Sequence, residues 1–356
     1  GTNTHMKSIV ATIQQEQNRI IRHDTSRLLI VQGAAGSGKT SAALQRVAYL
    51  LYKYRGKMTA DQIILFSPNA MFNSYVSGVL PELGEENMQQ ATFQEYLEHR
   101  LGSRFKVEDP YEQLEYMLTG ERNDAYRTRA AGIAFKASVR FFEAIRKCRE
   151  SLERSGMLFK GLKFRGESIV TARQIRERFY SVDTSLRFSV RIDKLAEWIS
   201  EKLDEVERTE RVKPWVLEEI ELLSNEDYQR AYAQIRKKNG FRSDSFDDHD
   251  RETDALARLV VRRKMKPLRE HVRLLRFIDI TGIYRRLFAV PGQFDGWLGQ
   301  DVPEEWPDIC RQTITALDEG TLFYEDATPY LLLKELIEGF QTNVTIKQVL
   351  VDEAQD

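Results

Sequence analysis

The chain has 356 residues, 42% of them hydrophobic, so it is long enough for two or three domains with packed cores and is not a disordered protein. Its 53 Lys and Arg residues nearly balance its 54 Asp and Glu residues, so the net charge identifies no partner. Cys148 and Cys310 lie far apart, which argues against a disulfide framework and favours a reducing compartment. No apolar run approaches the ~20 residues of a membrane helix, and the first residues lack an apolar signal core, so we expect a cytoplasmic protein that does not associate with membranes.

The first part of the chain alternates predicted strands and helices. A short amphipathic helix is predicted near residues 9–21, and the apolar run 27–33 predicts a strand. Residues 41–56 repeat apolar side chains at helical spacing and end on a glycine typical of a helix C-cap. A second buried strand is predicted at residues 63–66. Strands that alternate with helices favour a parallel sheet.

The pattern changes near residue 105 to long amphipathic helices. Residues 134–156 and 191–207 each carry an apolar stripe, and we expect such stripes to form the seam of a helical hairpin. The second stripe includes Trp198. The segment 291–308 is rich in Pro and Gly and contains Trp297 and Trp306, which predicts a loop with exposed aromatic side chains that anchor a partner, with local packing as the alternative.

Alternation returns at the end of the chain. Residues 324–340 predict a helix with Asp326 or Thr328 as its N-cap, and residues 346–353 predict a strand. We therefore predict an α/β domain formed by residues 1–104 and 325–356, interrupted by a mainly helical insertion over residues 105–324.

Charge is unevenly distributed along the predicted insertion. Residues 121–180 hold 15 Lys and Arg against 7 Asp and Glu, whereas residues 291–340 hold 2 against 11. Residues 260–276 predict a basic amphipathic helix. Such polarised surfaces can steer charged partners, although solvated helix faces also carry many charges.

A glycine-rich segment follows the first predicted strand. Its sequence, "GAAGSGKT", matches the phosphate-binding pattern G-x-x-x-x-G-K-[ST], with a predicted helix after it. Small residues let backbone N–H groups converge on phosphates, and the helix N-terminus adds a favourable dipole. Lys39 would reach the β and γ phosphates, and the Thr40 hydroxyl would ligate Mg²⁺. The predicted nucleotide site comprises Gly33, Ala34, Ala35, Gly36, Ser37, Gly38, Lys39 and Thr40.

The last predicted strand delivers two adjacent acids, in the sequence "VLVDEAQD". We expect Asp352 to hold the Mg²⁺ shell and Glu353 to orient or deprotonate the attacking water. Two acids after an apolar run are weak evidence alone. Together with the phosphate-binding loop they predict a nucleotide-hydrolysing site, with Glu353 and Lys39 as its catalytic residues.

These motifs, preceded by "IQQEQ", resemble the Q motif, motif I and motif II of the superfamily-one helicases of the UvrD/Rep type. The resemblance implies a RecA-like P-loop NTPase domain with a parallel sheet, and ATP and Mg²⁺ as its cofactors. It further implies that Gln17 reads the adenine and that Ser41 stands where many members have an Arg beside the nucleotide.

Longer stretches, residues 8–22, 31–52, 64–85 and 338–356, resemble the HelD family of helicase-like ATPases. This family binds bacterial RNA polymerase and helps to free it from nucleic acid. The resemblance implies that the chain is a first RecA-like domain with a clamp-arm insertion that binds RNA polymerase core. A second RecA-like domain would then lie outside this chain, and we expect the chain alone to hydrolyse ATP slowly.

The chain departs from the UvrD type where that family grips single-stranded DNA. The family's Thr-Asn-Lys-Ala-Ala is replaced by Ser67–Phe72, in which Asn69 is kept and the Lys is Ala70. The lost charge weakens a phosphate contact. Thr92 and Phe93 match motif Ib, and Phe93 either stacks on a base or belongs to the core. The sequence thus favours a polymerase-remodelling ATPase, and it leaves two alternatives, a single-stranded-DNA translocase and a polymerase-binding module that does not hydrolyse ATP.

Overall fold

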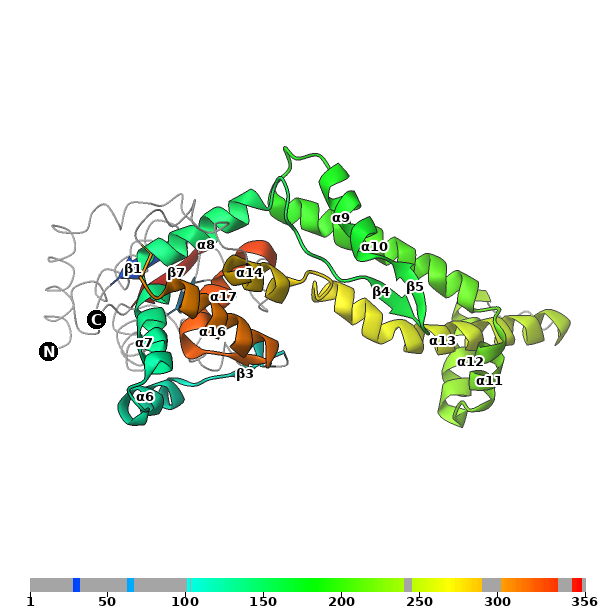
Figure 1. The fold of residues 1–356 in the computed structure, drawn as a ribbon. Helices are drawn as coiled ribbons and strands as arrows, with labels where there is room; N and C mark the ends of the chain where they lie inside the picture. Colours follow the sequence, from blue (N-terminus) through cyan, green and yellow to red (C-terminus); the bar gives the residue numbers. More distant parts are fainter. Residues whose placement is uncertain are drawn as a thin grey trace, which may run out of the picture. The chain divides into compact units, whose positions relative to one another are not determined.

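A computed structural model of the chain describes residues 28–32, 63–66, 101–102, 104–239, 245–289, 302–338 and 348–353 (Figure 1). The chain divides into two compact units. Unit 1 comprises Gly1–Leu152 and Ile280–Asp356, and unit 2 comprises Glu153–Asp279. This division differs from the predicted one, because residues 105–152 and 280–324 fall in unit 1 rather than in a separate insertion.

Three short strands of unit 1 pair in parallel in the order β1-β7-β2. They are β1 (Leu28–Gln32), β2 (Ile63–Phe66) and β7 (Gln348–Glu353). Figure 1 shows β1 in blue beside β7 in red, although more than 300 residues separate them in the sequence. All three segments were predicted as strands from their apolar runs.

The predicted RecA-like α/β class is nevertheless wrong for the part of the chain that the structure describes. That part is mostly helical, and no substantial parallel sheet is seen in it. The prediction extended three short apolar runs to a whole α/β domain, whereas among the described residues that sheet has only these three short strands. The amphipathic periodicity of residues 105–338 instead accounts for nearly all of the described elements, and the other sheets have two strands each.

Helices of unit 1 pack round an aromatic core. Asn123 and Ser138 cap α7 and α8 through side-chain oxygens that accept backbone N–H groups, as their residue types favour. The helices are α6 (Pro110–Thr119), α7 (Asp124–Lys136), α8 (Val139–Ser151), α14 (Ile280–Ala289), α16 (Trp306–Asp318) and α17 (Tyr324–Glu338). Short strands β3 (Lys106–Val107) and β6 (Thr321–Leu322) pair in parallel.

Trp306 belongs to this core. It is buried, and its ring contacts Phe135 edge to face at 5.2 Å and lies 5.8 Å from the Phe288 ring. The prediction of an exposed anchoring aromatic is therefore wrong for Trp306, and local packing is the correct alternative. Trp297 lies outside the described residues.

Unit 2 joins a β-hairpin to a set of helices. Its hairpin, β4 (Leu162–Phe164) and β5 (Glu167–Val170), turns at Arg165 (φ 50) and Gly166 (φ 83), the left-handed pair that a two-residue turn favours. In Figure 1 the long helix α10 runs beside α13, and the two pack together. The helices are α9 (Ala172–Ser181), α10 (Phe188–Glu210), α11 (Pro214–Glu221), α12 (Asn225–Asn239) and α13 (Ser245–Arg273).

The predicted apolar stripe of α10 is confirmed for its aliphatic members. Ile192, Leu195, Ile199 and Leu203 recur at helical spacing and are all buried. Trp198 is different, because it is only half-buried. No helix in the described segments is both long and apolar enough to cross a membrane. Neither Cys148 nor Cys310 forms a disulfide, and burial raises the pKa of the Cys148 thiol to about 12.

Candidate functional site

Two of the predicted site residues, Asp352 and Glu353, form the carboxyl end of β7 in the three-stranded sheet. Within the pairing of β1 with β7, Val31 is opposite Asp352 and Gln32 is opposite Glu353. Neighbouring strands in a sheet are about 4.8 Å apart. Gly33, the first residue of the phosphate-binding pattern, follows Gln32 directly. The start of that pattern and the two acids therefore leave the sheet at the same edge.

The other predicted site residues lie outside the described part of the chain. These are Gln17, Gly33, Ala34, Ala35, Gly36, Ser37, Gly38, Lys39, Thr40, Ser41, Asn69, Thr92 and Phe93. The strand β2 ends at Phe66, three residues before Asn69, and β2 pairs with β7 on the side opposite β1. Parallel pairing gives β2 the same carboxyl edge. At the level of the backbone, the structure thus brings together the ends of the three strands that precede or carry the predicted motifs.

A buried ionic cluster holds α17, the helix before β7, against α7. Arg129 of α7 donates from Nε and Nη2 to the two carboxylate oxygens of Glu325, at 2.6 and 2.7 Å. Its Nη2 also donates to Glu108. The Phe323 ring lies 3.8 Å from the guanidinium carbon. Such two-pronged pairing fixes orientation as well as distance.

A second buried ion pair, between Lys136 of α7 and Asp326 of α17, lies beside the first. Lys136 Nζ donates to Asp326 Oδ2 at 2.9 Å and to Thr313 Oγ1 at 2.7 Å, and the Tyr284 hydroxyl donates to Asp326 Oδ1 at 2.6 Å. The side chains of Lys136 and Asp326 are 2% and 0% exposed. The Asp326 carboxylate therefore joins α7, α14 and α17, and the prediction that Asp326 caps the helix is wrong, because α17 already begins at Tyr324.

Burial sets the electrostatics of this cluster. It raises the pKa of Asp326 above its ordinary 3.8, against the attraction of Lys136, and it raises the pKa of Glu108 above 4.5, against that of Arg129. For Arg129, burial opposes the charged form, but the hydrogen bonds and charge of Glu325 outweigh it and raise the pKa. Each of these charges has a partner of opposite sign, so we interpret the cluster as a frame for α17 rather than as a catalytic centre.

Sequence reasoning missed this cluster. Its acids, Glu325 and Asp326, lie 196 and 190 residues from their basic partners, and at the sequence level they looked like a helix N-terminus. The sequence offered only a weak signal. Arg129 and Lys136 are seven residues apart, a spacing that places two side chains on the same face of a helix, but the predicted helix over residues 134–156 did not include Arg129.

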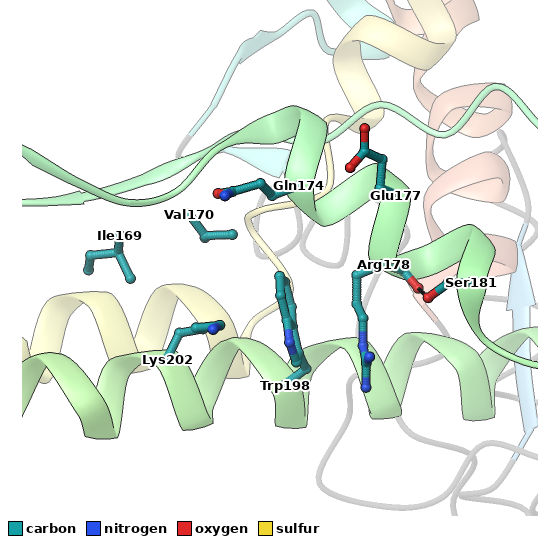
Figure 2. A pocket seen from close by; sticks show the side chains of 8 residues that line it. All are labelled: Ile169, Val170, Gln174, Glu177, Arg178, Ser181, Trp198 and Lys202. Atoms are coloured by element: carbon teal, nitrogen blue, oxygen red, sulfur yellow. Dashed lines mark hydrogen bonds between the residues drawn. The ribbon is translucent and has the colours of Figure 1, made fainter.

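Unit 2 contains a groove between α9 and α10, with a volume of about 410 Å³. Figure 2 shows Trp198 standing between Arg178 and Lys202. The Arg178 guanidinium carbon is 5.7 Å from the indole centroid, and Lys202 Nζ is 5.6 Å from it. The residues lining the groove are Ile169, Val170, Gln174, Glu177, Arg178, Ser181, Trp198 and Lys202.

The groove continues along α10 into a smaller hollow. The two share Arg178 and Ser181, and the second adds Lys194. The sequence pattern placed Trp198 in the apolar seam of α10. Lys194 and Lys202, four positions before and after it, were the signal that Trp198 lies at a charged surface instead.

No protein-family model matches the sequence, and no curated protein matches it. In the described parts of the chain, no cluster of His, Cys, Asp and Glu side chains is arranged to hold a metal ion. The candidate sites therefore depend on their residues alone.

Proposed function

We propose that the chain binds Mg-ATP at the carboxyl edge of β1 and β7, as part of a helicase-like ATPase that binds and remodels RNA polymerase. The observation that carries the first half is the strand register, in which Gln32 pairs with Glu353 and Val31 with Asp352. The phosphate-binding loop begins directly after Gln32 of β1, and the two acids end β7 on the neighbouring strand, although the two motifs are more than 300 residues apart in the sequence. A phosphate-binding loop and a metal-binding acid need that proximity, because the cation must touch both the phosphates and the acid.

Each residue has a defined role in this proposal. Lys39 neutralises the β and γ phosphates, and the Thr40 hydroxyl and Asp352 complete the Mg²⁺ shell. Glu353 orients or deprotonates the attacking water. Gln17 pairs with the adenine, which makes ATP the preferred nucleotide.

Nucleotide binding is tested by substituting Lys39. We expect Lys39→Ala to weaken binding of a fluorescent ATP analogue at least tenfold, measured by anisotropy in the presence of Mg²⁺, because the loop loses its only cationic side chain. Lys53→Ala, in the predicted helix that follows, is the matched control and should bind as the unsubstituted chain does. Equal affinity of the Lys39→Ala and Lys53→Ala variants would contradict the proposal.

The role of the acids is tested separately. Asp352→Asn should weaken binding in Mg²⁺ while leaving binding in EDTA unchanged, because only the metal-dependent part of the affinity uses the carboxylate. Glu353→Gln should leave both affinities unchanged and lower whatever hydrolysis rate the chain has. Loss of binding in EDTA as well would show that Asp352 is needed for the fold rather than for the metal.

The second half of the proposal concerns unit 2. Its α11 end carries the exposed side chains Val212, Leu217 and Leu222, at 85%, 56% and 78% exposure, and Glu218, Glu219 and Glu221 lie among them. An apolar patch with a charged rim is typical of a protein interface. We therefore propose that this end contacts RNA polymerase.

Polymerase binding is tested by co-purification of the tagged chain with core RNA polymerase. The double variant Leu217→Asp, Leu222→Asp should lose the complex, and Lys266→Ala, an exposed change on α13, should keep it. If the chain binds no polymerase and instead moves along single-stranded DNA, the translocase alternative is correct. If polymerase binding is kept and Lys39→Ala does not affect polymerase release, the non-hydrolysing module is correct.

A further inference from the structure

We propose that the groove between α9 and α10 of unit 2 binds single-stranded nucleic acid, at a site separate from the nucleotide site of the proposed function. Arg178, Lys194 and Lys202 would contact backbone phosphates, and Trp198 would stack on a base.

The spacing along α10 places the groups in one row. Lys194, Trp198 and Lys202 follow each other at four-residue intervals, so they share one face of the helix, and about 12 Å of helix axis separates the two lysines. Arg178 faces this row from α9 (Figure 2). The result is a cation, an aromatic ring and a second cation in line, with a third cation across the groove.

The cations of the groove are poorly compensated. In the part of unit 2 that the structure describes, neither Arg178 nor Lys194 forms an ion pair. Lys202 has only a long contact of 4.0 Å to Glu205. The segment 160–205, which includes all the groove residues, holds ten Lys and Arg against eight Asp and Glu, so the poorly compensated cations are a local feature of the groove. A polyanion is therefore the complementary ligand.

The acids that line the groove are already engaged. Glu177 accepts from Arg173 Nε at 3.0 Å, and a carboxylate oxygen of Asp183 accepts the backbone N–H of Ser185 at 2.9 Å. Both acids keep their charge, but each already has a hydrogen-bond donor of its own. With three cations and two acids in its lining, the groove presents a small excess of positive charge to a ligand.

The indole supplies the second feature. Trp198 is half-buried, so its ring has a fixed position and an accessible part, with Ile169 and Val170 as apolar neighbours. The charged groups of Lys202 and Arg178 lie on either side of the indole, 5.6 and 5.7 Å from the ring centre, and both are carried on flexible side chains. A base can replace one of them on the ring while the displaced cation pairs with the adjoining phosphate. Cationic grooves with aromatic platforms are how proteins bind single strands without reading their sequence.

This arrangement favours nucleic acid over an acidic peptide. Carboxylates of a peptide would satisfy Arg178, Lys194 and Lys202, but an acidic peptide has no regularly repeated flat group for Trp198. A single strand provides a base for each phosphate. The weak sequence preference of such sites also fits the lining, whose neutral hydrogen-bonding side chains are Gln174, Ser181 and the indole N–H of Trp198.

The test uses the full chain and a fluorescein-labelled oligothymidylate of twelve nucleotides, with binding followed by anisotropy at two or more salt concentrations. Trp198→Ala should weaken binding about fivefold or more, because stacking on one base is worth roughly 1–3 kcal/mol. Trp198→Phe keeps an aromatic face and should recover most of the affinity. Arg178→Ala and Lys194→Ala should each reduce the slope of log K against log salt by ~0.7.

The controls separate the proposal from its alternatives. Lys237→Ala removes an exposed cation on α12, outside the groove, and should leave the affinity within twofold. Lys39→Ala should not change oligonucleotide binding, so failure at the nucleotide site and failure here are distinguishable. Unchanged affinity in Trp198→Ala would overturn the proposal. So would an oligoglutamate peptide that displaces the oligonucleotide at equal concentration and depends equally on Trp198.

Discussion

Arg129 in unit 1 and Arg269 in unit 2 perform the same task in opposite surroundings. Each connects two elements that are far apart in the sequence, and each meets two carboxylates, Glu325 and Glu108 for Arg129, and Asp204 and Glu207 for Arg269. The side chain of Arg129 is 6% exposed and that of Arg269 is 33% exposed.

The difference determines what each ion pair contributes. Water screens and solvates the Arg269 cluster, so its attraction is offset by the entropy lost in ordering long side chains. Water cannot solvate the charges of the unit 1 cluster in this way. If one partner were removed, the other would be left as a buried, unpaired charge. We infer that the Arg129 cluster fixes a specific helix arrangement in unit 1, whereas the Arg269 cluster adds little to the packing of α10 against α13 in unit 2.

The largest predicted effect is on unit 1. Lys136→Ala should lower the free energy of unfolding by about 3–5 kcal/mol, because Asp326 is left buried without its cation. Urea unfolding followed by circular dichroism measures the loss. The double variant Lys136→Met, Asp326→Leu removes both charges and should recover most of the stability. A double variant as unstable as the single one would show that packing, rather than the unpaired charge, causes the loss.

Acid should act in opposite directions on the buried cluster of unit 1 and on the hydrogen-bonded carboxylates Asp227 and Glu210 of unit 2. Burial raises the pKa values of Asp326 and Glu108, so their contribution to stability is complete below their ordinary 3.8 and 4.5 and is lost as pH rises through the raised values. In unit 2, the hydrogen bond from Arg263 lowers the pKa of Asp227. The pKa of Glu210 is also lowered, because hydrogen bonds from Lys213 and Trp215 outweigh its burial. Those contributions are present above 3.8 and 4.5 and are lost as pH falls.

Hydrogen exchange between pH 6 and pH 3.5, corrected for the intrinsic exchange rate, checks this comparison. Amides of α10 and α12 should lose protection on acidification relative to amides of α7 and α17. Equal loss in both units would contradict the assigned directions of the pKa shifts.

The smallest predicted effect belongs to Arg269. Arg269→Ala should cost less than about 1 kcal/mol, and the cost should shrink further in high salt, because the pair is partly exposed. The same urea measurement serves here. A cost that equals that of Lys136→Ala would remove the distinction between the two units.

The sequence predicted those features that depend on local pattern. Apolar runs located β1, β2 and β7, and helical periodicity located α8, α10 and most of α17. The stripe of Ile192, Leu195, Ile199 and Leu203 is buried as its spacing indicated. These signals are short in range, since each is set by neighbours within two turns or a few strand residues.

Features that depend on distant partners were not predictable. The α/β class was wrong because three strand-like runs say nothing about how much sheet surrounds them. Asp326 was taken for a helix cap because the sequence does not show Lys136 and Tyr284 beside it. Trp198 and Trp306 exchanged their expected roles for the same reason: whether an aromatic ring is covered depends on helices elsewhere in the chain.

The unbroken length of α10 has a mechanical consequence. Its 23 residues make a rod of about 35 Å, and both ends are fastened within unit 2. Near one end Arg191 donates to the carbonyl of Glu153, and at the other Glu210 accepts from Lys213 and from the Trp215 indole at 2.6 Å. Because the helix is unbroken, a tilt of about 10° about its first turn would displace its last turn, together with the Lys213 and Trp215 side chains bonded there, by about 6 Å.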